Sequence, residues 1–177
     1  MADQTIQQRA SHIKLLLMDC DGVMTDARMW LTPDGDEQKA FHARDGQGIS
    51  VWHRAGWESG IISGRASSSV ERRAHELKIK YVHQYAKAKL VALETVLTEA
   101  AVIADECCYI GDDLGDVGVM RQVGLAVAVA DAADETKAVA HYVTTLQGGK
   151  GAIREVIELI LKAQGRWDDV IAPVISR

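Results

Sequence analysis

The feature that most constrains this chain is a short apolar run that ends in two aspartates. Residues 13–18 read Ile-Lys-Leu-Leu-Leu-Met and are followed by Asp19 and Asp21, with Gly22 directly after. The run has the length of a buried strand and is too short to cross a membrane. Residues i and i+2 of an extended chain point to the same side, so both carboxylates project together from the strand end. Such a pair repels unless a proton or a cation lies between the carboxylates, and a divalent cation with oxygen ligands meets that need.

The same Asp-x-Asp-Gly pattern is also typical of a turn, because Asp and Gly commonly follow strands. A calcium-binding EF-hand loop is excluded, because its glycine belongs at the sixth position and Gly22 is the fourth. A turn and a metal site therefore both remain open on this stretch alone.

Composition indicates one globular domain over residues 1–177. The chain has 177 residues, 47% hydrophobic and 25% charged, which is long enough for a sizeable core. A net charge of -5 argues against nucleic-acid binding, and no apolar run is long enough for a membrane span. Residues 1–11 lack the apolar core of a secretory signal. Cys20, Cys107 and Cys108 fit no metal or disulfide spacing, which predicts reduced thiols and a cytoplasmic location.

Short apolar runs alternate with amphipathic segments along most of the chain. Strands are expected at residues 13–18, 60–62, 81–82, 107–110, 125–129 and 142–144. Helices are expected at residues 48–57, 67–77, 88–100, 115–123, 132–140 and 151–164. This alternation predicts the α/β class, a Rossmann-like three-layer fold with a central parallel sheet.

Two segments stand outside this alternation. Pro33, Asp34 and Gly35 separate two short runs and predict a β-hairpin flap over residues 27–41. Residues 167–177 are expected to form a C-terminal tail that is disordered or reaches into an adjacent site.

Polar clusters follow four of the predicted strands. They are Asp19 with Asp21, the run Ser63-Gly64-Arg65, the segment after Val82, and Asp112 with Asp113. Ligands of parallel sheets bind at the carboxyl ends of the strands, so we expect these clusters to converge.

The converging residue types suit phosphoryl transfer. A carboxylate such as Asp19 can attack phosphorus, and a second one, Asp21, can protonate the leaving oxygen and later activate water. Ser63 and nearby amides can hold phosphoryl oxygens, and Lys87 or Lys89 can neutralise charge. Asp112, with Asp113 or Asp116 behind it, can complete a Mg²⁺ site. Each element alone is ordinary, as a helix cap, a solvated lysine or an acidic turn, but their ordered occurrence at strand ends favours a shared site.

This ordered set resembles the haloacid dehalogenase superfamily of phosphohydrolases. The matching positions are Asp19, Asp21, Ser63, Lys89, Asp112 and Asp113. The resemblance implies that Asp19 is the nucleophile, that Asp21 is the acid/base, and that Ser63 and Lys89 complete the catalytic set. It also implies Mg²⁺ as cofactor, held by Asp19, Asp112, Asp113 and the backbone carbonyl of Asp21.

Further motifs resemble the 3-deoxy-D-manno-octulosonate 8-phosphate (KDO 8-phosphate) phosphatase branch, which acts in lipopolysaccharide precursor synthesis. They are Asp-Gly-Val-x-Thr-Asp, Phe-x-x-x-Asp-Gly-x-Gly, Ser-Gly-Arg, Gly-Asp-Asp and Gly-Gly-Lys-Gly-Ala, spread over residues 13–165. The resemblance implies substrate contacts from Asp21, His42, Arg44, Asp45, Gly46, Gly64, Arg65, Arg73 and Lys89. Arg65 follows Ser-Gly where phosphatases of nine-carbon sugar acids commonly carry Glu. Tyr85 departs from the family, which usually has glycine before the motif lysine.

The spacing of the motifs leaves no room for a separate capping domain of about 50 or more residues. Water exclusion and sugar recognition then fall to the hairpin, to a neighbouring subunit or to the tail. Apolar Met29, Trp30 and Leu31 are then interface residues, unless they pack locally, and the family resemblance implies a homotetramer. Two alternatives remain: the same chemistry on a nine-carbon keto-sugar acid 9-phosphate, and a receiver-type phospho-switch without turnover.

Overall fold

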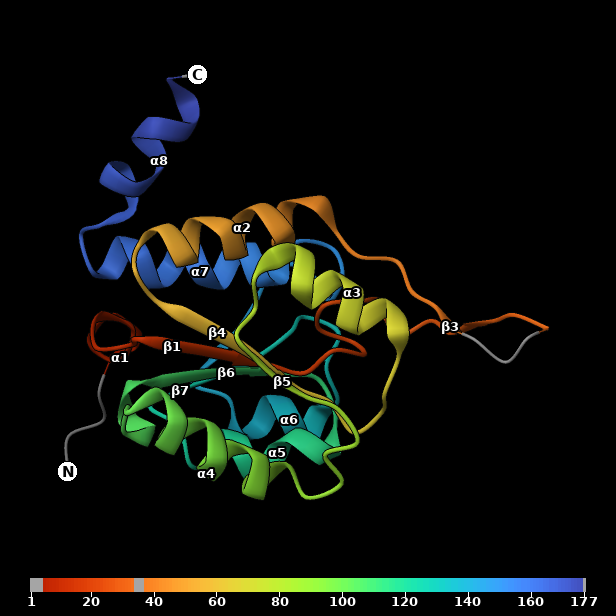
Figure 1. Cartoon of the computed structure of the whole chain (residues 1–177). Coiled ribbons are helices and arrows are strands. Elements are labelled where there is room, and N and C mark those ends of the chain that lie inside the picture. Colours follow the sequence, from red (N-terminus) through yellow and green to blue (C-terminus); the bar gives the residue numbers. More distant parts are fainter. Residues whose placement is uncertain (1–4, 34–36, 177) are drawn as a thin grey trace.

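The centre of the computed structural model, which describes residues 5–33 and 37–176, is a six-stranded sheet (Figure 1). Its strands are β1 (Leu15–Met18), β4 (Glu58–Ile62), β5 (Tyr81–His83), β6 (Cys107–Gly111), β7 (Leu125–Ala128) and β8 (Tyr142–Val143). The order is β5-β4-β1-β6-β7-β8, and every neighbouring pair is parallel. From β1 the chain adds β4 and β5 on one side, and then crosses to the other side of β1 to add β6, β7 and β8. The direction in which strands are added thus reverses between β1 and β6. Ligands bind at such a switch point, outside the carboxyl ends of the strands.

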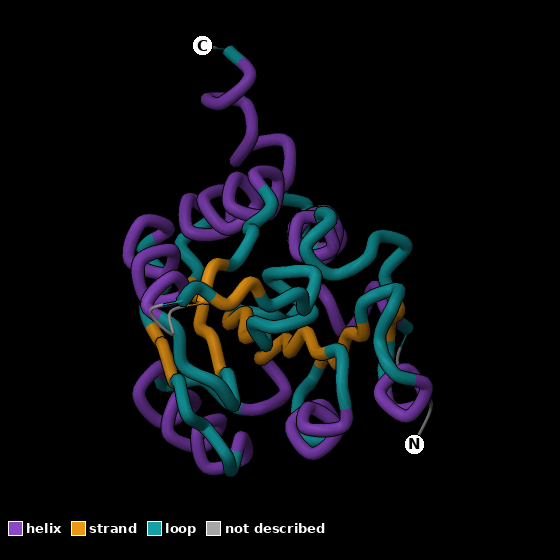
Figure 2. Tube along the Cα trace, turned by 90° about the vertical axis from the view of Figure 1, so that its right-hand side faces the viewer, coloured by secondary structure: helices purple, strands orange, loops and turns teal. Residues whose placement is uncertain are grey.

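Helices cover both faces of this sheet, as Figure 2 shows. The helices on one face are α2 (Ala43–Arg54), α3 (Ser68–Leu77) and α7 (Ala152–Ala163), and those on the other are α4 (Lys89–Ala100), α5 (Val117–Met120) and α6 (Asp134–Val139). The helix α1 (Ile6–Ser11) packs against α7 and β7, and the 3-10 helices η1 (Ala104–Glu106) and η2 (Leu114–Asp116) flank β6. Every residue of β1, β6 and β7 is buried, as expected for strands covered on both faces. The predicted α/β fold with a central parallel sheet is confirmed.

The hairpin predicted over residues 27–41 contains β2 (Trp30–Leu31) paired antiparallel with β3 (Glu37–Gln38). It extends away from the sheet, as Figure 1 shows. The predicted turn residues Asp34 and Gly35 lie outside the described residues. Between β1 and β4 the described residues form only this hairpin and α2 as regular elements.

Two helix predictions had wrong boundaries. The helix expected at residues 48–57 begins at Ala43 and ends at Arg54, so it includes Gly46 and Gly48. Both glycines allow close packing, because a Cβ atom on Gly46 would lie 2.3 Å from the Arg73 guanidinium, and one on Gly48 would lie 3.1 Å from Cα of Arg154. The helix expected at residues 115–123 is shorter, and consists of η2 followed by α5.

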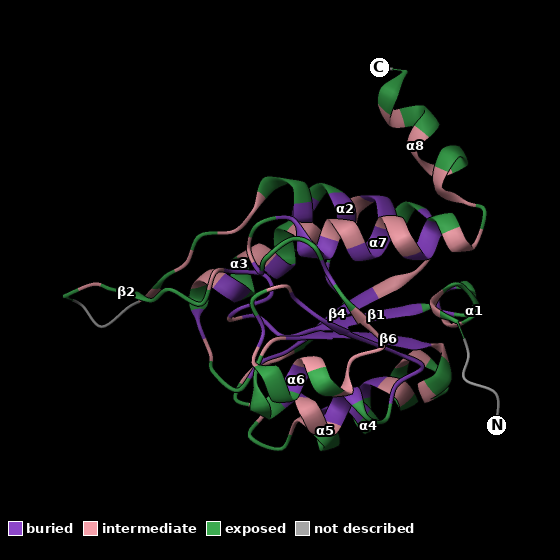
Figure 3. Ribbon diagram, turned by 180° about the vertical axis from the view of Figure 1, so that it is seen from behind, coloured by how far each residue is buried: buried purple, intermediate pink, exposed green. Residues whose placement is uncertain are grey.

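The expected tail is largely a helix, α8 (Trp167–Ile175), which has no buried residue and leads away from the sheet (Figure 3). The Trp167 ring anchors its start beneath two cations, with Arg154 at 4.9 Å and Lys162 at 5.5 Å from the ring centroid. Within the described part of the chain, no helix combines the length and the apolar character that a bilayer span requires.

Candidate active site

Three carboxylates meet at the carboxyl ends of β1 and β6. Asp19 follows β1, while Asp112 and Asp116 follow β6, and each contributes an oxygen within 4.8 Å of the others. The two strands are hydrogen-bonded neighbours, with Met18 opposite Ile110. The predicted convergence of Asp19 and Asp112 is therefore observed, at the position where the sheet topology predicts a ligand.

Lys89, the first residue of α4, holds two of these acids. Its Nζ donates to Asp19 Oδ1 at 2.7 Å and to Asp116 Oδ1 at 2.8 Å, and its side chain is largely buried. Burial alone would lower the pKa of Lys89, but the charges of Asp19 and Asp116 raise it. The other candidate, Lys87, is exposed. Lys89 is therefore the cation of the cluster.

Asp116 is an orienting residue rather than an available ligand. The Tyr109 hydroxyl donates to its Oδ1 at 2.7 Å, and the amides of Asp112 and Asp113 donate to its Oδ2 at 3.0 and 3.3 Å. Tyr109 is fully buried. Asp113 lies outside the acid cluster, because its side chain is exposed and caps η2 by accepting from the Leu114 amide at 2.8 Å. Of the two acids that the sequence analysis left open behind Asp112, Asp116 therefore lies in the cluster, and Asp113, which the family resemblance implies as a ligand, does not.

Asp112 has the unmet bonding capacity of a metal ligand. Its Oδ1 is buried and has no hydrogen-bond partner among the described residues. Burial, with the charges of Asp19 and Asp116, raises the pKa of Asp112 to about 8. Burial and Asp116 likewise raise the pKa of Asp19 to about 6, although Lys89 opposes this. An orphaned carboxylate oxygen among several acids fits a hard divalent cation, which would keep these groups ionised.

The approach of Asp112 to the β1 loop depends on Gly22. This residue has φ +101, and a Cβ atom there would lie 2.0 Å from Asp112 Oδ2. The glycine of the Asp-x-Asp-Gly motif is therefore required both by the left-handed backbone and by the space that Asp112 occupies.

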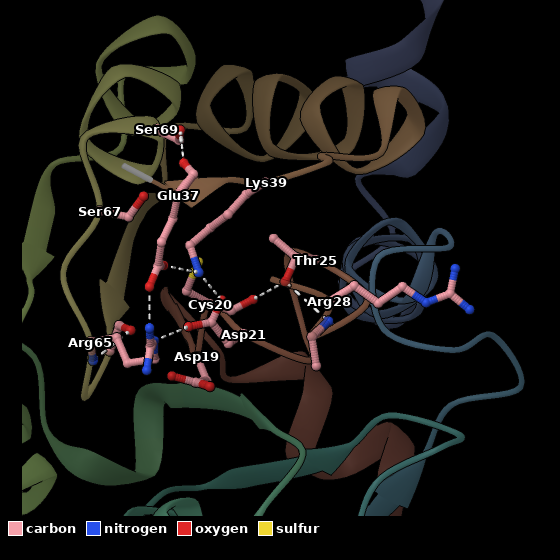
Figure 4. Close-up of polar contacts among 12 residues, drawn as sticks. Asp19, Cys20, Asp21, Thr25, Arg28, Glu37, Lys39, Arg65, Ser67 and Ser69 are labelled. Atoms are coloured by element: carbon pink, nitrogen blue, oxygen red, sulfur yellow. Dashed lines mark hydrogen bonds and ion pairs between the residues drawn. The ribbon is translucent and has the colours of Figure 1, made fainter. Parts of the chain in front are cut away.

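Asp21 faces a different set of charges, which comes from the flap and from the β4 loop (Figure 4). Lys39 contacts Asp21 Oδ1, and Arg65 Nε lies 3.8 Å from Asp21 Oδ2. Glu37 pairs with Arg65 and lies 3.3 Å from Lys39 Nζ. The sequence analysis missed Glu37 and Lys39. Alternation along an extended segment puts residues 37, 39 and 41 on one side, and this signal could have found them.

Ser63 is buried directly after β4, and its Oγ accepts from the Arg65 amide at 3.3 Å. The N-cap position of α3 is Ser67 rather than Ser63, without a capping hydrogen bond from the Ser67 side chain, and Gly64 is exposed. Ser63 and Gly64 therefore form a turn that directs Arg65 toward Asp21.

The other residues predicted to contact substrate lie outside the carboxylate cluster and have other partners. Asp45 accepts from the amides of Gly151 at 3.1 Å and Arg154 at 2.9 Å, so it caps the start of α7. His42 Nδ1 lies 3.8 Å from Asp45 Oδ2, and Arg44 is exposed on a groove beside α7.

The Arg73 guanidinium packs beside Gly46 and pairs with Glu76 at 2.8 Å. It lines a groove between the flap and α3 together with Lys39 and Phe41. None of His42, Arg44, Asp45, Gly46 and Arg73 belongs to the carboxylate cluster.

Tyr85 occupies a left-handed conformation with φ +56 and is largely exposed. Glycine adopts this region without strain, which accounts for the glycine that is usual here in the family that the sequence resembles. Tyr85 therefore differs from the usual glycine in its side chain but adopts the same left-handed turn before α4.

Comparisons with known proteins agree with this geometry. A family model described as haloacid dehalogenase-like hydrolase matches residues 82–157. The chain is 46% identical over 168 residues to 3-deoxy-D-manno-octulosonate 8-phosphate phosphatase KdsC of Yersinia pestis, covering 95% of this chain and 89% of that protein.

Two solved structures share the fold. The phosphatase of the same name from Moraxella catarrhalis, in complex with magnesium, phosphate and KDO, has a TM-score of 0.92 and 43% identity, covering 96% of this chain and 97% of that one. The cobalt-bound enzyme of Haemophilus influenzae has a TM-score of 0.90 and 35% identity, covering 96% and 100%.

The capping role of Asp45 predicts a loss of stability on substitution. Asp45→Ala removes two charged hydrogen bonds at the start of α7 and should lower the free energy of unfolding by about 2 kcal/mol. Asp45→Asn keeps an acceptor and should lose less. Urea unfolding measures both changes, and a loss below about 0.5 kcal/mol for Asp45→Ala would contradict the cap.

The raised pKa values of Asp19 and Asp112 predict pH-dependent metal binding. Both groups bind protons more tightly when folded than unfolded, so the metal-free protein should lose stability as pH rises from about 4 toward 8. The protons on both carboxyl groups compete with Mg²⁺, so the affinity for Mg²⁺ should rise roughly 100-fold between pH 6 and pH 8. Calorimetric titration measures this. Asp112→Asn should bind Mg²⁺ more weakly with a flatter profile, and a pH-independent affinity of the unmodified protein would refute the account.

Proposed function

This chain belongs to the KDO 8-phosphate phosphatase family of haloacid dehalogenase-like hydrolases, and we propose that it releases phosphate from KDO 8-phosphate with Mg²⁺ as cofactor. It is a phosphoric monoester hydrolase. The observation that carries the proposal is the Asp19–Lys89 pair beside the orphaned oxygen of Asp112. This arrangement combines a carboxylate held by a lysine with a carboxylate oxygen that is available to a cation, and phosphoryl transfer requires both.

In the proposed reaction Asp19 attacks phosphorus and forms an aspartyl phosphate. Lys89 orients Asp19 and neutralises charge, while Ser63 and the nearby backbone amides hold phosphoryl oxygens. Asp21 protonates the leaving sugar oxygen and then takes a proton from the water that hydrolyses the intermediate.

The proposed metal ligands are Asp19, Asp112 and the backbone carbonyl of Asp21, with Asp116 orienting the site. When bound, Mg²⁺ supplies positive charge against the phosphoryl oxygens. Asp113 is left out of this set, because its carboxylate lies outside the acid cluster.

Arg65 supports a sugar acid as substrate. Its guanidinium lies half-exposed beside Asp21, where it can bind a carboxylate in a planar, bidentate manner. The groove that holds Arg73 between the flap and α3 offers a second cation to the sugar. A nine-carbon keto-sugar acid 9-phosphate has the same reacting groups and is the competing substrate.

A substrate panel tests the proposal. With Mg²⁺, KDO 8-phosphate should give a higher kcat/KM than nine-carbon sugar acid phosphates, and equal or reversed preference would refute the choice of sugar. Asp19→Asn should abolish turnover in a protein that still folds, because it removes the nucleophile. Turnover that persists in Asp19→Asn would exclude Asp19 from that role. A receiver-type switch would retain phosphate on Asp19 instead of cycling.

We further propose that each subunit is a single catalytic domain without a cap domain. Four such subunits form a homotetramer, and the flap makes the contact between them. Met29, Trp30 and Leu31 are 51%, 65% and 73% exposed, which is unusual for three consecutive large apolar residues. Cys20, Cys107 and Cys108 are buried free thiols, which supports a cytoplasmic location.

Loss of flap contacts should dissociate the assembly. Trp30→Glu places a charge in the proposed interface and should convert tetramer to smaller species in light scattering after size exclusion. Ile103→Glu is the matched control, because Ile103 is 64% exposed but precedes η1, far along the chain from the flap. A tetramer that survives Trp30→Glu would place the interface elsewhere.

A further inference from the structure

We propose that Lys39 is a positioning residue, whose ammonium group holds the Asp21 carboxylate in the orientation for proton transfer to the sugar oxygen. The inference rests on the proposed function, in which Asp21 is the acid/base. Lys39 follows β3 of the flap, and its side chain is only 1% exposed. It reaches back to contact Asp21 Oδ1, as Figure 4 shows.

Each aspartate of the Asp-x-Asp motif then has its own lysine. Lys89, from α4, holds the nucleophile Asp19, whereas Lys39, from the flap, holds Asp21. The other cation near Asp21 in the described structure is Arg65, at 3.8 Å, and Arg65 also pairs with Glu37. Lys39 is therefore the direct anchor of Asp21.

Packing alone does not require a charge at this position. An uncharged side chain of similar length would fill the space without the cost of removing an ammonium group from water. Glu37 Oε2, at 3.3 Å, offsets part of that cost. What the ammonium group adds is a fixed direction for the Asp21 carboxylate.

If Lys39 orients the Asp21 carboxylate, the step that depends on Lys39 is proton transfer from Asp21 to the leaving sugar oxygen. In the first step the bond from Asp19 oxygen to phosphorus forms, the bond from phosphorus to the sugar oxygen breaks, and the proton of Asp21 moves to that oxygen. Lys39 neither gives nor receives a proton. An alkoxide leaving group needs this proton, whereas nitrophenolate leaves without it.

The experiment compares Lys39→Met on two substrates. The value of kcat/KM depends only on the steps up to formation of the aspartyl phosphate. The later attack of water on that intermediate therefore does not affect it. We expect kcat/KM to fall about 100-fold for KDO 8-phosphate and less than about 5-fold for p-nitrophenyl phosphate. Lys39→Arg keeps the charge and should recover much of the selective loss. Lys89→Met should lower both values alike, because Lys89 contacts the nucleophile.

A matched control and a double-mutant cycle separate positioning from folding. Lys80→Met removes the same charge from a lysine that is 54% exposed and pairs with Glu58, and it should leave both kcat/KM values unchanged. In an Asp21→Asn background, Lys39→Met should cause no further loss, because its effect acts through Asp21. Thermal unfolding identifies any variant that is not folded.

Equal losses on both substrates, or an additive loss in the Asp21→Asn background, would overturn the proposal. Failure of the proposed function appears differently, as an unmodified protein that cleaves p-nitrophenyl phosphate but not KDO 8-phosphate. Phenyl phosphate, whose leaving group is poorer than nitrophenolate, then takes the place of the sugar phosphate, and the comparison still decides the role of Lys39.

Discussion

Repulsion among the carboxylates at the β1–β6 switch point is the constraint on which this site depends. Asp19, Asp112 and Asp116 lie within 4.8 Å of one another because the two strands are neighbours and end at the same edge. Lys89 and Tyr109, with two backbone amides, compensate Asp116 fully, and Lys89 also compensates Asp19. Asp112 keeps one oxygen without a hydrogen-bond partner among the described residues. The fold therefore favours binding of a cation at this position.

Much of this arrangement is predictable from the sequence, because strands buried on both faces appear as short apolar runs and the polar residues follow them directly. The parallel sheet and the meeting of Asp19, Lys89 and Asp112 follow from that pattern. The choice between Asp113 and Asp116 does not, because it depends on the tight turn of η2, which brings the Asp116 carboxylate back to the amides of Asp112 and Asp113. The spacing of Asp113 and Asp116 matches a capping box, and that local signal would have favoured the observed assignment.

Other features depend on tertiary contacts that leave little trace in the local sequence. Gly46 lies inside α2, where the absence of a side chain leaves space for the Arg73 guanidinium of α3. Asp45 looks like a free acid in sequence, yet it caps α7, more than a hundred residues further along the chain. Lys39 looks like an ordinary hairpin lysine until the flap folds back and buries it against Asp21.

The two lysines divide the site between the sheet and the flap. Lys89 begins α4, which packs on the sheet, so Asp19, the proposed nucleophile, is held by an element of the core. Lys39 belongs to a two-stranded hairpin, which has little stability of its own. The flap is attached to the body through Lys39, the Glu37–Arg65 pair and the Ser69 hydroxyl, which donates to the Glu37 carbonyl at 3.0 Å. In the proposed assembly, a contact that covers the exposed Trp30 would also fix Lys39, which links the proposed flap interface to the orientation of Asp21.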